Sequence, residues 1–181
     1  RTIVPISASK AMGRGVYALQ GLLYDATAER ATEVADLLRA RSLPGRHNWQ
    51  NAAAAYAAVR GLGISAEEAA EGLMSFPGLA HRMQQVARVK VIAFINDSKA
   101  TNADAAEKAL SSFENIYWIA GGIAKAGGIE PLKPLFPRVA RAYLIGQAAD
   151  EFAGAIGSGI PFEKSGTLEK AVAAALRGAE A

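Results

Sequence analysis

The first half of the chain alternates short apolar stretches with two helical patterns. The apolar residues on either side of Gly21 predict two short strands. Residues 49–60 are rich in alanine and predict a helix, which the glycines just beyond them end. Residues 65–76 predict a second helix, because Ser65 stands three positions before Glu68, the spacing of a capping box.

The second half of the chain alternates apolar, β-favouring runs with helical patterns. The predicted strands are 89–95, 116–120 and 142–146, and the predicted helical segments are 103–113, 130–140, 147–157 and 167–179. Alternation of this kind is typical of βαβ units. We therefore predict an α/β fold whose second domain has a Rossmann-like, mainly parallel sheet.

Pro77 and Gly78 interrupt the pattern between the two halves. This break predicts two domains, residues 1–79 and 80–181. The chain starts abruptly and ends on a helix, where a doubly wound sheet usually continues with a strand. We therefore interpret it as a fragment of a longer protein.

Composition narrows the class of protein. Of the 181 residues, 51% are hydrophobic and 20% charged, which predicts a packed core and argues against disorder. No apolar run is long enough to span a membrane, and no signal-peptide pattern is visible. The absence of cysteine excludes disulfides and thiolate metal sites and favours a reducing, cytoplasmic location. The net charge of +3 comes from scattered basic residues, which argues against nucleic-acid binding.

The polar turn Asn96–Asn102, with the sequence NDSKATN, follows a predicted strand directly. Ligands of open parallel sheets bind beyond the carboxyl ends of the strands, where this turn and the loops at 121–128 and after Gly146 are expected. Asp97 could accept hydrogen bonds from ribose hydroxyls, and Lys99 could attract an anion at the start of the next helix. An ordinary turn, with a solvated lysine and a helix cap at Asn102, explains the same residues.

Four further polar residues are candidates for binding. The loop GGIAKAGG contains Lys125 but matches neither a P-loop nor a dinucleotide fingerprint, so Lys125 is either a ligand for an anion or a solvated lysine. Asn48 and Asn51 could present amides to a nucleotide, although Asn48 is equally suited to cap the helix. Arg82 could clamp a phosphate at the domain junction or form a salt bridge there.

The motifs GRHNWQN, FPGLAHRMQ, NDSKATN and AGGIAKAGG occur in an order and at separations that resemble the bacterial Mur ligases. The resemblance covers nearly the whole chain. It implies that residues 1–79 are the end of a central ATPase domain and that residues 80–181 are most of a Rossmann-like C-terminal domain, truncated at its end.

The motif NDSKATN further resembles the member of this family that adds D-glutamate to UDP-N-acetylmuramoyl-L-alanine in peptidoglycan precursor synthesis. The implied reaction is ATP-dependent amide formation through an acyl phosphate, in a monomeric enzyme. The resemblance implies ATP and Mg²⁺ as cofactors, with the metal ligands outside this chain. A fragment of this extent is not expected to turn over alone.

The resemblance also implies which residues contact the nucleotide. Asn48 and Asn51 match amides that face it. Arg82 matches a residue that contacts the phosphates, and Asp97 matches one that contacts the ribose.

On the substrate side, Lys99 and Thr101 match residues near the D-glutamate and phosphate site. Lys125 matches a lysine that pairs with a D-glutamate carboxylate, so Lys99 and Lys125 are the expected catalytic residues. Two alternatives are a Mur-type ligase for another amino acid and a non-catalytic, Rossmann-like nucleotide-binding module. The lack of glycine in the turn at 96–102 argues against the second alternative.

Overall fold

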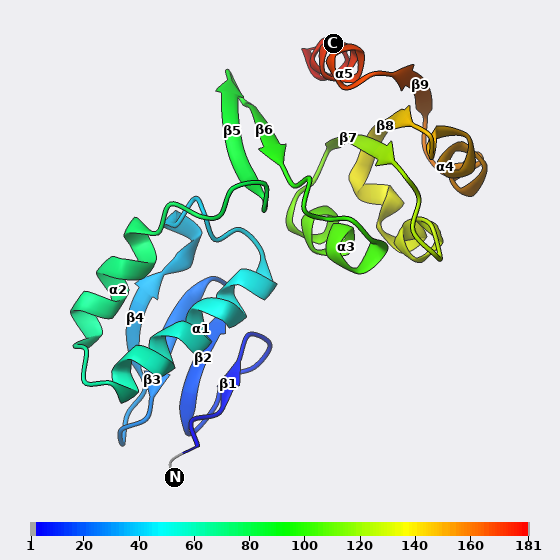
Figure 1. Ribbon diagram of the computed structural model, residues 1–181. Coiled ribbons are helices and arrows are strands. Elements are labelled where there is room, and N and C mark those ends of the chain that lie inside the picture. Colours follow the sequence, from blue (N-terminus) through cyan, green and yellow to red (C-terminus); the bar gives the residue numbers. More distant parts are fainter. Residues whose placement is uncertain (1–2, 181) are drawn as a thin grey trace. The chain divides into compact units, whose positions relative to one another are not determined.

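The computed structural model describes residues 3–180 and divides into two compact units, Arg1–Gln84 and Gln85–Ala181 (Figure 1). We call them unit 1 and unit 2 and describe each by itself. Both contain a sheet with helices packed on it, as the α/β prediction requires.

Unit 1 contains a four-stranded sheet in the order β1-β2-β3-β4. Its first two strands pair in parallel and the others are antiparallel. The two strands predicted around Gly21 are confirmed, whereas the fourth was not predicted, because the segment TEVAD has few apolar residues. The strands are β1 (Ile6–Ser7), β2 (Gly15–Leu19), β3 (Leu22–Ala26) and β4 (Thr32–Asp36), and a short 3₁₀ helix, η1 (Leu37–Arg39), follows.

Two helices complete unit 1, α1 (Arg46–Gly61) and α2 (Ala66–Ser75). The predicted capping box of α2 is confirmed. The Ser65 hydroxyl accepts a hydrogen bond from the Glu68 N–H at 3.1 Å, and the Glu68 carboxylate accepts one from the Ser65 N–H at 3.0 Å. Both helices pack on the sheet around one core, whose largest fully buried side chains are Val16, Leu23, Leu37 and Tyr56.

A polar network ties α1 to the sheet of unit 1. The Asp25 carboxylate accepts hydrogen bonds from the Thr27 N–H at 2.9 Å, the Thr27 hydroxyl at 2.6 Å and the Tyr56 hydroxyl at 2.8 Å. Burial alone would raise the pKa of Asp25, but these hydrogen bonds and the positive charge of Arg60 outweigh it and hold the pKa below its ordinary value. Burial and the hydrogen bond to Asp25 raise the pKa of Tyr56 to about 12.

This network predicts acid-dependent stability of unit 1. A carboxyl whose pKa is lowered by folding contributes stability above its unfolded pKa, about 4, and loses it as the pH falls through the folded value. Asp25→Asn should therefore cost about 1–3 kcal/mol at pH 7, because the amide leaves a buried donor unpaired. The difference from the parent chain should shrink below about pH 4.

Urea unfolding followed by Trp49 fluorescence, in a Trp118→Phe background, measures this effect. Glu33→Gln, at an exposed acid on β4, is the matched control. An Asp25→Asn variant that differs from the parent equally at pH 7 and pH 3 would contradict the prediction.

Unit 2 is built on three parallel strands in the order β7-β8-β9. This confirms the mainly parallel sheet that the sequence predicts for the second half of the chain. The strand β9 was not predicted, because its sequence FEKSG is short and polar. The strands are β7 (Ile116–Gly122), β8 (Val139–Gly146) and β9 (Phe162–Gly166), and the helices are α3 (Ala103–Ser112), η2 (Glu130–Arg138, a 3₁₀ helix), α4 (Ala149–Ile156) and α5 (Leu168–Glu180).

Helices cover both faces of this sheet (Figure 1). Alternate residues of β8 point to opposite faces. Ala142 and Leu144 join the core formed with α3, η2 and α4, and Tyr143 packs with α5. Tyr117 and Trp118 of β7 pack against these same two cores, as predicted.

The strand predicted at 89–95 does not belong to the parallel sheet. It is β6 (Ile92–Asn96), which pairs with β5 (Gln84–Val89) in a separate two-stranded hairpin. The chain reverses at Lys90, whose φ of 53° lies in the left-handed region. The predicted placement of the 96–102 turn at the carboxyl edge of the parallel sheet is therefore wrong, whereas the loops after β7 and β8 do lie at that edge.

Candidate functional site

Asn48 and Asn51 lie in the first turns of α1. The helix begins one turn earlier than predicted, with Gly45 as its N-cap, and the Gly45 carbonyl accepts the Asn48 N–H at 3.0 Å. The interpretation of Asn48 as the N-cap is therefore wrong. Its side-chain Nδ2 instead donates to the Pro44 carbonyl at 2.7 Å. Asn51, three positions on, lies on the same side of the helix and is exposed.

Arg82 lies on the segment that leaves unit 1. Its N–H donates to the Leu79 carbonyl at 3.2 Å, and these two residues form an isolated β-bridge. The Arg82 side chain is exposed and has no ion-pair partner among residues 3–180, so the alternative of a junction salt bridge is not formed. The next residue, Met83, lies with its Sδ 4.0 Å from Asn48 Nδ2. The structure thus brings the segment that carries Arg82 against the start of α1.

The turn after β6 is shaped by its own hydrogen bonds. The Asn96 Oδ1 accepts the Ser98 N–H at 3.1 Å, and the Asp97 carbonyl accepts the Ala100 N–H at 2.8 Å. Asp97 is half-buried at this turn. The local bonds fix the backbone, so the side chains that follow are presented from a defined loop.

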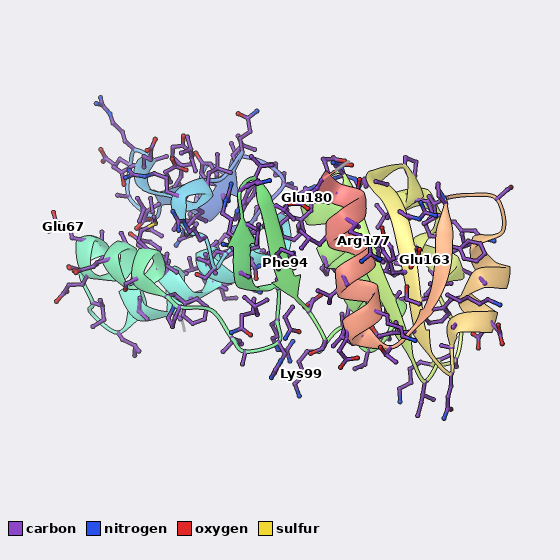
Figure 2. The ribbon with its side chains drawn as sticks, turned by 90° about the horizontal axis from the view of Figure 1, so that it is seen from above. Glu67, Phe94, Lys99, Glu163, Arg177 and Glu180 are labelled. Atoms are coloured by element: carbon purple, nitrogen blue, oxygen red, sulfur yellow. The ribbon has the colours of Figure 1, made fainter. Side chains whose placement is uncertain are left out.

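Asn102 caps α3, as predicted: its Oδ1 accepts the Ala105 N–H at 2.9 Å. Lys99 and Thr101 directly before it are exposed. Figure 2 shows Lys99 at the end of the hairpin, with its side chain directed away from the ribbon. Lys99 and Thr101 thus lie in the turn that leads into the positive end of the α3 dipole.

Lys125 lies on the loop that follows β7. The Gly128 N–H donates to the Lys125 carbonyl at 3.0 Å, which closes a turn and leaves the lysine side chain exposed. Two glycines allow this edge of the sheet to form: a Cβ on Gly121 would lie 1.9 Å from the Ile145 carbonyl oxygen, and one on Gly146 would lie 3.0 Å from the Gly122 nitrogen. The backbones of β7 and β8 thus approach closely just before the loop.

The two lysines of the predicted site differ from most lysines of unit 2. Neither Lys99 nor Lys125 has a hydrogen-bond or ion-pair partner for its side chain within the described part of the chain. An exposed, uncompensated ammonium group is available to a carboxylate or a phosphate. Carboxylates pair with four other lysines of unit 2, namely Lys90, Lys108, Lys133 and Lys164.

Within residues 3–180, no three His, Asp or Glu side chains gather in a group that could hold a metal ion. No helix in the same range is long and apolar enough to cross a membrane. The candidate site residues carry two amides, three cations, one carboxylate and one hydroxyl, at Asn48, Asn51, Arg82, Lys99, Lys125, Asp97 and Thr101.

Met83 was missed by the sequence reasoning, although it stands next to Arg82. The motif LAHRMQ contains it, but a lone methionine carries no binding signal. Its backbone adopts the left-handed region, with a φ of 46°, which nothing in the local sequence predicts.

A model of the family described as "Mur ligase, glutamate ligase domain" matches residues 81–181. A Caulobacter vibrioides protein named UDP-N-acetylmuramoylalanine--D-glutamate ligase is 69% identical over 172 residues, which is 95% of this chain and 36% of the relative. A Phenylobacterium zucineum protein of the same name is 67% identical over all 181 residues and 39% of its own length. The chain thus spans less than two fifths of these relatives.

The fold also resembles solved structures. A crystal structure of MurF from Acinetobacter baumannii aligns with a TM-score of 0.65 over 94% of this chain and 40% of that one, at 22% identity. This likeness supports the architecture of the two units. Because the family model matches more than half of the chain, the chain belongs to the Mur ligase family.

Proposed function

We propose that this chain is part of a cytoplasmic, monomeric, ATP-dependent ligase that joins D-glutamate to UDP-N-acetylmuramoyl-L-alanine in peptidoglycan precursor synthesis. Residues 1–79 would be the end of its central ATPase domain and residues 80–181 most of its C-terminal domain. The observation that carries the proposal is the 69% identity to relatives named for this reaction, over 95% of the chain.

The first chemical step activates the L-alanyl carboxylate of UDP-N-acetylmuramoyl-L-alanine. The L-alanyl carboxylate attacks the γ-phosphorus of ATP, the bond to the β-phosphate oxygen breaks, and an acyl phosphate and ADP form. Asn48 and Asn51 would contact the nucleotide, Arg82 would contact its phosphates, and Asp97 would accept hydrogen bonds from the ribose hydroxyls. These groups match the nucleotide chemically, because Arg82 is a cation with no ion-pair partner among the described residues, and the amides offer both donors and acceptors.

The second step makes the amide bond. The D-glutamate amine attacks the acyl carbon, a tetrahedral intermediate forms, and its collapse releases inorganic phosphate while the amine loses a proton. Lys125 would pair with a carboxylate of D-glutamate, and Lys99 and Thr101 would lie near the amino acid and the phosphate. Lysine charges stabilise the negative charge that develops on the transferring oxygens.

Mg²⁺ would neutralise phosphate charge during the first step. Its ligands would come from the part of the longer protein that this chain does not span. For this chain, the proposed contribution is therefore positioning and charge, supplied by exposed or half-buried side chains on three loops and at one helix start.

The test uses a hybrid ligase, made by replacing the matched segment of the Caulobacter vibrioides relative with the corresponding 172 residues of this chain. We expect the hybrid to consume ATP and attach D-glutamate to UDP-N-acetylmuramoyl-L-alanine, detected by mass spectrometry of the product. The 181-residue chain alone should give no product.

Other amino acids serve as competing substrates in the same assay. Attachment of L-alanine, L-lysine or diaminopimelate in preference to D-glutamate would support a Mur-type ligase of different specificity and overturn the proposal. Binding of NAD by the 181-residue chain, in calorimetry, together with an inactive hybrid, would favour a non-catalytic nucleotide-binding module instead.

A further inference from the structure

The segment that carries Arg82 is fastened to unit 1 at two points. We call residues 76–84 the Arg82 strap. Near its start, the Ser42 hydroxyl donates to the Phe76 carbonyl at 2.5 Å. Near its end, Met83 Sδ lies 4.0 Å from Asn48 Nδ2, within reach of a weak N–H···S hydrogen bond. The strap therefore lies along the loop that leads into α1.

The backbone of the strap is unusual on both sides of Arg82. His81 has a φ of 63° and Met83 a φ of 46°, so two residues other than glycine adopt the left-handed region within three positions. The backbone N–H of His81 donates to the Gln84 side chain at 3.0 Å. This conformation places Met83 inside, at 7% exposure, and leaves Arg82 exposed beside it. Such strain persists only where the surroundings enforce it.

The contact with Met83 also bears on the orientation of the Asn48 side-chain amide, that is, on whether its oxygen or its nitrogen is accessible to a ligand. The Nδ2 group has two hydrogens and two acceptors, the Pro44 carbonyl at 2.7 Å and Met83 Sδ at 4.0 Å. The Oδ1 atom accepts no hydrogen bond from the described residues, and none of their unpaired side-chain oxygens is buried. The Asn48 Oδ1 is therefore an acceptor with solvent access, while its amide nitrogen is held by the protein.

We propose that Met83 is a positioning residue for nucleotide binding. Its sulfur holds the Asn48 amide with the acceptor outward, and its buried side chain anchors the strap so that Arg82 stands beside the start of α1. Met83 would thus position both Asn48 and Arg82, two of the residues that the proposed function assigns to ATP binding. This inference rests on that function and adds a residue that would itself touch no substrate.

Two substitutions separate the sulfur's role as an acceptor from its role as core packing. Met83→Leu keeps the volume and the apolar character but removes the acceptor. Met83→Gln restores an acceptor for Asn48 Nδ2 at a greater cost in core stability. In the hybrid ligase we expect Met83→Leu to raise the KM for ATP about three- to tenfold, the range for loss of one modest hydrogen bond. The KM for D-glutamate should stay unchanged.

The test depends on whether the two variants rank differently in melting temperature and in the KM for ATP. We expect Met83→Gln to have the lower melting temperature in the 181-residue chain, yet the ATP KM closer to that of the parent hybrid. Met74→Leu, at a methionine on α2 that is 37% exposed, is the matched control and should change neither quantity.

An ATP KM that follows the melting temperature, with Met83→Gln worse than Met83→Leu, would overturn the proposal and leave Met83 as core packing alone. Equal ATP KM values for the parent and Met83→Leu would also overturn it. An unsubstituted hybrid that attaches no D-glutamate would instead refute the proposed function. The two failures are therefore distinct.

Discussion

Lys125→Ala in the hybrid ligase is expected to lower kcat/KM for D-glutamate by about 10- to 150-fold. The estimate follows from a charge-assisted hydrogen bond, about 1.5–3 kcal/mol, and the tenfold change that each 1.4 kcal/mol gives. The Lys125 ammonium group is exposed and has no partner in the described structure, so its loss leaves no protein carboxylate unpaired. The substitution should therefore change the kinetics for D-glutamate, while the KM for ATP stays within about twofold of the parent value.

Lys133→Ala is the matched control for this prediction. Lys133 is another exposed lysine of unit 2, about half accessible, and it pairs with Glu130 at 2.5 Å. Its loss changes the net charge by the same amount, so any general weakening of anion attraction appears in both variants. Steady-state kinetics with D-glutamate varied at saturating ATP measure the difference. Equal kinetics for Lys125→Ala and Lys133→Ala would remove Lys125 from the proposed site.

Local signals in the sequence were enough to predict several elements and their ends. The capping box at Ser65 and the cap at Asn102 each depend on residues three positions apart, and both formed as predicted. The parallel strands β7 and β8 each contain an apolar run that ends in glycine, so they could be predicted without knowledge of their neighbouring strands. Such elements carry their determinants within a few residues.

Other features depend on pairing partners that the local pattern does not specify. The predicted strand at 89–95 runs across Lys90, where a left-handed turn instead separates β5 from β6 in a hairpin. A lysine at such a turn is uncommon, so the sequence favoured a single strand of the main sheet. Similarly, Asn48 suits an N-cap, but Gly45 starts the helix first.

The candidate site shows the same division. Asp97, Lys99 and Lys125 were predicted as site residues because polar loops at the carboxyl ends of parallel strands bind ligands. Of these three, only Lys125 follows a strand of the parallel sheet. The contacts that support the candidate residues could not be predicted. The contact between Asn48 and Met83 joins residues 35 positions apart and depends on a strained backbone, neither of which has a local signature.

Gly121→Ala is expected to destabilise unit 2 by roughly 3 kcal/mol or more, which is at the upper end of the range that single substitutions usually cost in stability. An added Cβ would lie 1.9 Å from the Ile145 carbonyl oxygen and 2.7 Å from its carbonyl carbon. These are backbone atoms of the adjacent strand, which pairs with β7 in register at this position. No side-chain rotation relieves the overlap, so the carboxyl end of β7 must separate from β8.

The neighbouring Gly122 provides the control for backbone strain. Its φ of 98° also disfavours alanine, but an added Cβ would have no atom within 4 Å, so Gly122→Ala should cost only about 1–2 kcal/mol. Urea unfolding of the 181-residue chain, followed by Trp118 fluorescence in a Trp49→Phe background, compares the two. Equal stabilities would show that the strands do not approach as closely as described. A larger loss for Gly121→Ala would mean that close packing of β7 on β8 sets the start of the loop that carries Lys125.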